Sequence, residues 1–185
     1  MAYDTLLDCL TGKLRYAEAP STVYAAKIKD HPDHIKLGFC QLTTRNRRFS
    51  DPWLTETIYE SCKDEEMRIM SGDLSRCDAF VVEQWLLQEL EYCREQIPAL
   101  MEEEWSGRFE TLRIPEKKQA SFARWLEQEV NWRVMSNKFV FMLEDLVTSA
   151  AEQAAFEPIK AKYEAGVAKR KKSVAAILKK QRAAK

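Results

Sequence analysis

The sequence contains no apolar run that approaches the ~20 residues of a membrane span, so we expect no transmembrane helix. Residues 1–4 lack the basic start of a secretory signal peptide, and no apolar middle follows them, which predicts a cytoplasmic protein. Glycine and proline are scarce, with five and six residues, whereas 45% of the 185 residues are apolar. This composition excludes a fibrous or fully disordered chain and predicts one compact domain, with room for an appendage.

The cysteines form no CxxC pair and are odd in number. A zinc site needs tighter clustering, and a secreted disulfide framework usually has an even number. The five cysteines are Cys9, Cys40, Cys62, Cys77 and Cys93. We therefore expect reduced and mostly buried thiols, as in a cytosolic protein.

The chain also lacks a net charge, but this neutrality is the sum of two unlike parts. The sequence has 29 Lys and Arg residues and 29 Asp and Glu residues. Residues 160–185 hold ten basic residues and one acidic residue, Glu164, so this segment carries +9 and residues 1–159 carry −9. Such charge asymmetry predicts an anionic partner for the C-terminal segment.

Two β-type runs predict an antiparallel hairpin near the start of the chain. The runs Thr22–Ile28 and His34–Cys40 flank the polar segment Asp30–Asp33, in which proline fixes φ and aspartate bonds its own backbone. Met67–Met70 and the alternating run Arg108–Ile114 are candidates for a further strand.

Most of the remaining sequence has helical periodicity. The strongest stripe, from Asp78 onward, consists of Ala79, Val82, Leu86, Leu90 and Cys93. Further helices are expected over residues 3–10, 54–63, 115–132, 137–155 and 157–185. The aromatic residues expected in the core of the C-terminal helices are Phe122, Trp125, Trp132, Phe139 and Phe141.

These patterns predict an α+β protein with a small three-stranded antiparallel sheet, flanking helices and a helical C-terminal extension. The expected organisation is a helical lead over 1–20, a sheet-bearing domain over 21–114, a helical extension over 115–156 and a basic tail over 157–185.

The hairpin carries two tripeptides that resemble the paired signature of the GIY-YIG nucleases. Thr22-Val23-Tyr24 and Lys36-Leu37-Gly38 are separated by eleven residues. Arg47 lies nine residues after the second tripeptide, and Glu83 follows on a predicted helix. In the family, the tripeptides lie on adjacent strands, an arginine follows the second, and a helical glutamate binds metal. The resemblance covers residues 21–114 and implies a GIY-YIG-like fold for them.

Three positions depart from the family pattern. Thr22 stands in place of the first glycine, Lys36 in place of the second tyrosine, and Cys40 where threonine is common. The phage-type branch of the family often has Lys-Ile-Gly in this slot, so Lys36 is compatible with that branch.

The resemblance implies a metal-dependent DNA endonuclease that hydrolyses phosphodiester bonds. Glu83 would hold one Mg²⁺ or another divalent cation, which keeps most of its water ligands. Arg47 would contact the phosphate and stabilise the charge of the transition state. Tyr24 would orient or deprotonate the attacking water. Lys36 would either do the work of the second tyrosine or contact the phosphate.

Basic residues outside the signature are the predicted DNA contacts. They are Arg45, Arg48, Lys169, Arg170, Lys171 and Lys172. Lysine and arginine on such a tail add DNA affinity that depends on salt and not on base sequence. Because the rest of the chain is acidic, a local basic patch at residues 45–48 is required to keep the DNA from being repelled.

Two alternatives remain open at this stage. The chain is either a catalytically impaired relative that binds DNA or acts as an adaptor, or an unrelated helical subunit of a nucleoprotein assembly. In the second case the C-terminal helices would bind a protein partner, and no sheet is expected. The nuclease hypothesis predicts instead that Tyr24, Lys36, Arg47 and Glu83 converge on one shallow surface.

Overall fold

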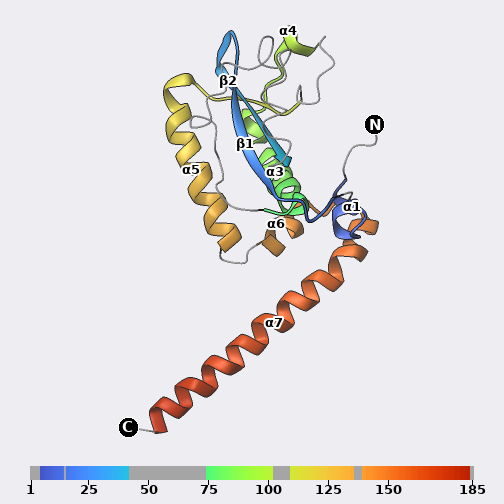
Figure 1. The fold of residues 1–185 in the computed structure, drawn as a ribbon, viewed down its shortest axis with the longest axis vertical. Coiled ribbons are helices and arrows are strands. Elements are labelled where there is room, and N and C mark those ends of the chain that lie inside the picture. Colours follow the sequence, from blue (N-terminus) through green and yellow to red (C-terminus); the bar gives the residue numbers. More distant parts are fainter. Residues whose placement is uncertain (1–4, 15, 42–73, 102–108, 136–138, 184–185) are drawn as a thin grey trace.

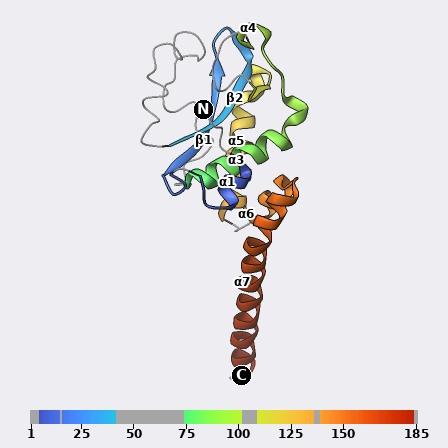
Figure 2. The ribbon, with the colours of Figure 1, turned by 90° about the vertical axis from the view of Figure 1, so that its right-hand side faces the viewer.

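The computed structural model describes residues 5–14, 16–41, 74–101, 109–135 and 139–183. These residues form an α+β fold, as the sequence predicts, with a three-stranded antiparallel sheet and flanking helices. The last helix runs away from the sheet and ends far from it (Figure 1), and the perpendicular view in Figure 2 shows the same extended helix. Among the described helices, none is long and apolar enough to cross a membrane.

The sheet has the order β1-β2-β3, with β2 in the centre. Strand β1 spans Ser21–Ile28, β2 spans His31–Gln41, and the short β3 spans Thr111–Arg113. The predicted hairpin is therefore confirmed, and so is the strand predicted within residues 108–114. The other predicted strand, over residues 67–70, lies outside the described residues.

The hairpin turns earlier than the sequence predicts. Its loop is Lys29-Asp30, and Asp30 adopts a φ of 60°, a left-handed conformation that aspartate tolerates better than most residues. The pairing register then shifts between Lys27 and Ile28, so β2 is irregular where Pro32 lies. A bulge is one of the few places in a sheet where proline is tolerated, because proline has no N–H for the ladder.

The irregular start of β2 anchors the helix that follows β3. This helix, α5, spans Glu116–Met135. The Asp33 carboxylate accepts a hydrogen bond from the Glu116 N–H at 2.9 Å, while the Asp33 carbonyl accepts one from the Ile114 N–H at 2.8 Å. Asp33 thus satisfies a donor that a helix N-terminus leaves without an intrahelical partner. The predicted turn residue is therefore a helix cap.

The other helices agree with the predicted periodicity but have different limits. They are α1 over Leu6–Leu10, α3 over Arg76–Glu89, the 3₁₀ turn η2 over Glu91–Cys93, α4 over Pro98–Met101, α6 over Phe139–Leu146 and α7 over Ala150–Ala183. Helix α3 begins where the Ser75 hydroxyl accepts a hydrogen bond from the Asp78 N–H at 3.0 Å. The helix predicted over residues 54–63 lies outside the described residues.

One hydrophobic core joins the sheet to helices from both halves of the chain. The sheet and α3 contribute, among others, Val23, Ile35, Leu37, Ala79, Val82, Leu86 and Leu112. The C-terminal helices contribute Leu126, Val130, Met142, Leu143 and Phe156. Residues from the 115–156 range therefore build the same core as the sheet.

The predicted burial of the C-terminal aromatic residues is wrong for three of them. Trp125, Trp132 and Phe141 are 44%, 50% and 43% exposed. In α5, Leu126 and Val130 face the core instead, at the i, i+4 spacing of one helix face. Trp125 and Trp132 lie on a neighbouring face of the helix. The spacing of apolar residues in the sequence does not show which of these two faces is buried.

The helix predicted over 137–155 is divided into α6 and α7 by a capping box. The Ser149 N–H donates to the Glu152 carboxylate at 2.9 Å, and the Glu152 N–H donates to the Ser149 hydroxyl at 3.2 Å. The Thr148 N–H donates to the same carboxylate at 3.1 Å. These reciprocal bonds fix where α7 starts.

The capping box predicts an acid-sensitive contribution to stability. Burial raises the pKa of Glu152, but hydrogen bonds from Ser149 and Thr148 outweigh it, so the pKa lies below the ordinary 4.5. A carboxyl group whose pKa is lower in the folded state stabilises the fold above its unfolded pKa, and this stabilisation is lost as the pH falls through the folded pKa. Gln keeps an acceptor oxygen but loses the negative charge near the helix N-terminus, so we expect Glu152→Gln to cost about 0.3–1 kcal/mol of unfolding free energy at pH 7.

Urea denaturation at pH 7 and at pH 3 measures this effect. The difference between the wild type and Glu152→Gln should shrink at the lower pH, while Glu164→Gln, on an exposed turn of the same helix, should change little at either pH. A difference that stays constant between the two pH values would contradict the assignment.

Candidate active site

The strand register brings Tyr24 and Lys36, the two key positions of the paired signature, to one place. In the β1–β2 ladder, Tyr24 lies opposite Gly38, and Lys36 lies opposite Ala26. The Lys36 ammonium is 5.7 Å from the centre of the Tyr24 ring, within the range of a cation–π contact. Two of the four predicted catalytic residues are therefore neighbours on one face of the sheet.

Gly38 makes this proximity sterically feasible. A Cβ atom at this position would lie 2.7 Å from both Cζ and Oη of Tyr24 and 3.0 Å from Nζ of Lys36. Both side chains thus cross over the Gly38 backbone, where any larger residue would displace them. Steric crowding alone therefore explains why glycine occupies this position of the second tripeptide, without reference to any family. We call these three residues the Tyr24–Lys36–Gly38 cluster.

Lys36 is buried, and its ammonium contacts both a carboxylate and a backbone carbonyl. Its side chain forms an ion pair with the carboxylate of Glu110, and its ammonium donates a hydrogen bond to the Leu37 carbonyl at 2.9 Å. The residue is 1% exposed, and Tyr24 is 3% exposed. A buried ammonium is costly unless it is paired, so Glu110 is the residue that allows a lysine at this position.

Glu110 is a site residue that sequence reasoning missed. It immediately precedes β3 and is separated from Lys36 by 74 positions in the chain. The ion pair depends on the β2–β3 register, in which Lys36 lies opposite Thr111. In the sequence, Glu110 is the third residue of the alternating run 108–114. The sequence does not reveal how this run pairs with β2, so it does not reveal that Glu110 meets Lys36.

Glu83 lies on α3, which packs on the other face of the sheet. Side chains alternate across a strand, so Tyr24 and Lys36 point away from the face that carries Val23 and Leu37. That second face forms the core with α3. Glu83 is 4% exposed, and its carboxylate accepts a hydrogen bond from the Gln84 amide at 3.2 Å. The structure thus brings Tyr24 and Lys36 together on one face of the sheet and places α3, which carries Glu83, on the opposite face.

The described residues do not fit a hydrated magnesium ion. In the described ranges, no three His, Cys, Asp or Glu side chains gather closely enough to hold a metal ion together. Glu83 would be a single protein ligand, with water at the other positions of the ion. A side chain that is 4% exposed leaves no space for such a hydration shell in this conformation.

The predicted phosphate and DNA contacts are distributed between two regions. Arg45, Arg47 and Arg48 lie outside the described residues. The basic residues 169–172 lie on α7, and all four side chains are exposed.

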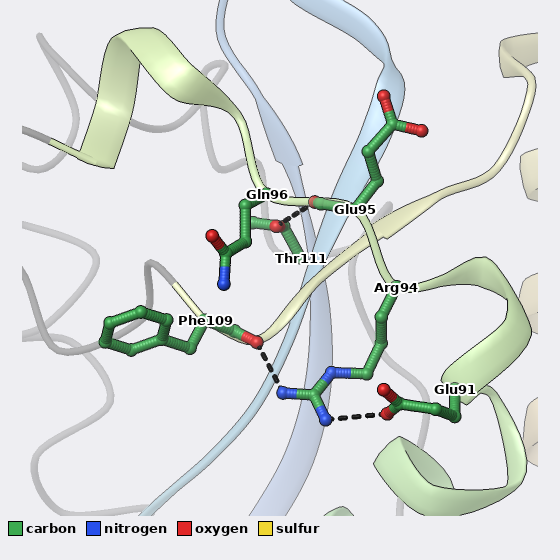
Figure 3. Close-up of a pocket in the computed structure, with 6 residues that line it drawn as sticks. All are labelled: Glu91, Arg94, Glu95, Gln96, Phe109 and Thr111. Carbon is green, nitrogen blue, oxygen red and sulfur yellow. Dashed lines mark hydrogen bonds and ion pairs between the residues drawn. The ribbon is translucent and has the colours of Figure 1, made fainter.

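A cleft of about 400 Å³ opens beside β3 (Figure 3). Its lining consists of Glu91, Arg94, Glu95, Gln96, Phe109 and Thr111. One of these lining residues, Thr111, pairs with Lys36 in the β2–β3 ladder. In Figure 3, the Arg94 guanidinium donates one hydrogen bond to the Glu91 carboxylate at 2.7 Å and another to the Phe109 carbonyl at 2.9 Å. The Glu91 carboxylate is paired with Arg94 and the Glu95 carboxylate with Arg113 at 3.3 Å, so the cleft has no unpaired arginine among these residues to attract a phosphate.

Comparisons with known proteins add no relative. The chain matches no protein-family model, no curated protein and no solved structure.

The crowding at Gly38 predicts a stability cost for the smallest side chain. Gly38→Ala would push a methyl group to 2.7 Å from the Tyr24 ring, so we expect a loss of about 1–3 kcal/mol of unfolding free energy. Equilibrium unfolding in urea measures it. In the double variant Gly38→Ala/Tyr24→Leu, which removes the phenol from the contact, the two costs should not add.

Gly166→Ala is the matched control. Nothing lies within 4 Å of a Cβ at Gly166, which is inside α7, so this substitution should stabilise the chain by about 0.5–1 kcal/mol. If Gly38→Ala raises the unfolding free energy as Gly166→Ala does, the side chains of Tyr24 and Lys36 do not cross over Gly38.

Proposed function

We propose that this chain is a GIY-YIG-type DNA endonuclease. One observation carries the proposal: Tyr24 and Lys36 meet over Gly38 on adjacent antiparallel strands, in the relation that the resemblance implies for the two tripeptides. The three-stranded antiparallel sheet, with the hairpin before α3 and the third strand after it, agrees with the small sheet and flanking helices that the resemblance implies.

The proposed roles follow from the chemistry of each side chain. The Tyr24 hydroxyl would position the attacking water, and the Lys36 ammonium would place a positive charge near the phosphate. Arg47 remains the proposed second cation of the site. Glu83 is 4% exposed on the helix that covers the other face of the sheet, so it would hold Mg²⁺ only in a conformation that opens space around its carboxylate. Because Lys36 is paired with Glu110, contact with a phosphate would require the ammonium to leave that carboxylate.

A plasmid-nicking assay tests the catalytic proposal. With Mg²⁺ or Mn²⁺ present, the wild type should convert supercoiled DNA to nicked circles, and Tyr24→Phe should lose about 10²-fold or more of the rate, the usual contribution of a proton-transfer group. Tyr92→Phe is the matched control because Tyr92 is 83% exposed, and its rate should equal that of the wild type.

The metal assignment needs its own variants. Glu83→Ala and the isosteric Glu83→Gln should both abolish nicking while their circular dichroism spectra remain those of the wild type. Cleavage that survives in both variants would remove Glu83 from the metal site. Absence of nicking by the wild type with every divalent cation tried would reject the endonuclease.

A second candidate is a catalytically impaired relative that binds DNA. Its supporting observation is the Lys36–Glu110 ion pair, which engages the residue that replaces the second tyrosine. Both Lys36 and Tyr24 are also buried, as structural residues are. In this case the DNA affinity would reside mainly in α7.

The geometry of α7 supports DNA contact under either candidate. The helix touches the rest of the protein near its start, where the Phe141 and Tyr163 rings pack at 5.9 Å, and then projects outward (Figure 1). Consecutive residues are about 100° apart around an α-helix, so exposed residues 169–172 surround most of its circumference. Basic side chains on several sides of an exposed helix can each approach a phosphate, which supports contact with DNA.

Charge removal on α7 should weaken DNA binding and its salt dependence. Replacing Lys169, Arg170, Lys171 and Lys172 by Gln should lower the affinity for a random duplex. It should also reduce the slope of log K against log salt by up to about 3–4, since each phosphate contact contributes about 0.9. Mobility-shift titrations at three salt concentrations measure both quantities.

The matched control removes the same charge from the protein body. It replaces the exposed residues Lys13, Lys117, Lys118 and Arg124 by Gln. The control should retain most of the affinity and salt slope. Equal losses in the two quadruple variants would mean that net charge, rather than α7, governs binding.

A further inference from the structure

An apolar stripe runs along α7 from the core to the exposed part of the helix. Helix residues that are three or four positions apart share one face. Phe156 is 1% exposed, and Ile159 packs against the core. The stripe continues at this spacing over Tyr163, Val167, Arg170 and Val174. Because Val174 is 55% exposed, the face that joins α7 to the core presents apolar surface to solvent further along the helix.

A hollow on this side of α7 carries opposite charges at equal distances from its centre. It is open, measures about 230 Å³ and is lined by Tyr163, Glu164, Val167, Ala168 and Lys171. Glu164 precedes Val167 by three residues, and Lys171 follows Ala168 by three. Seven residues are about two turns, so Glu164 and Lys171 lie on the same side of the helix. A two-fold axis through the hollow would therefore set each Glu164 beside the Lys171 of another copy.

The charges along α7 favour such a pair in the antiparallel orientation. Residues 150–166 contain three acidic and two basic residues, whereas residues 167–183 contain seven basic residues and no acidic one. In a parallel pair, the two basic halves would lie side by side and repel each other. In an antiparallel pair, each basic half would lie along the inner half of the other helix and point toward the acidic body of residues 1–159.

We propose that α7 pairs with the α7 of a second copy of this chain, antiparallel and centred between Val167 and Ala168. The pairing would cover the apolar stripe, including the exposed Val174, and the hollow of each copy would face that of the other. It would also give the outer half of α7 the packing from which long helices in proteins gain most of their stability. The pairing does not depend on endonuclease activity.

The paired helices would still present basic side chains to solvent. With consecutive residues about 100° apart, Lys169 and Lys172 lie about 140° and 160° around the helix axis from Val174. They therefore point away from the proposed interface, whereas Lys171 lies beside it. A dimer of this kind would carry two outward-facing basic surfaces, one on each α7.

Sedimentation equilibrium of the full chain from micromolar to millimolar concentration tests the pairing. The wild type should dimerise, and more weakly at high salt. Glu164→Lys or Lys171→Glu each turns two attractive pairs per dimer into repulsive ones, so the dissociation constant should rise about tenfold or more. Lys162→Glu is the matched control. It lies nine residues from Lys171, half a turn away around the helix, and should not weaken the dimer.

Mixing the two variants determines the orientation. In an equimolar mixture of Glu164→Lys and Lys171→Glu, an antiparallel heterodimer regains two attractive pairs, so its dissociation constant should return to that of the wild type. A wild type that stays monomeric, dimers that neither charge reversal weakens, or a mixture as weak as each variant alone would overturn the proposal. A monomer that binds vesicles of anionic lipid would assign the stripe to a membrane surface instead.

Discussion

The pairing register of β1 and β2 is the constraint on which the candidate site depends. With Tyr24 opposite Gly38, the phenol and the Lys36 ammonium share the space above a residue that has no side chain. A slip of β1 by one residue would turn Tyr24 toward the core face and Val23 away from it, and it would separate the phenol from Lys36. The core with α3 therefore selects the same register that assembles the cluster.

The buried ammonium gives this arrangement a second requirement. Lys36 is stable inside the sheet because Glu110 neutralises it, and Glu110 is positioned by the pairing of β3 with β2. Removing one partner of such a pair typically costs about 3–5 kcal/mol, because the other charge is left buried. The short strand β3, with only three residues, is thus what positions the carboxylate that neutralises Lys36.

Much of the fold could be predicted from local patterns. Alternation identified the hairpin and the strand containing Leu112, and the apolar stripe identified α3. Features that depend on tertiary contacts could not be read in this way. The Lys36–Glu110 pair joins distant segments, and the exposure of Trp125 is decided by which face of α5 meets the core. The spacing of the two tripeptides predicted that Tyr24 and Lys36 lie close together. It did not indicate which face of the sheet α3 covers, and so it could not place Glu83.

The long α7 gives the unpaired chain a large permanent electric dipole. Its 34 residues correspond to about 50 Å of helix, with the basic residues toward the outer half and an acidic body at the other end. In the field of a polyanion, such a particle rotates as it diffuses, so that the C-terminus arrives first. The charges of α7 would therefore set the orientation of an encounter with any polyanion before the sheet comes close to it.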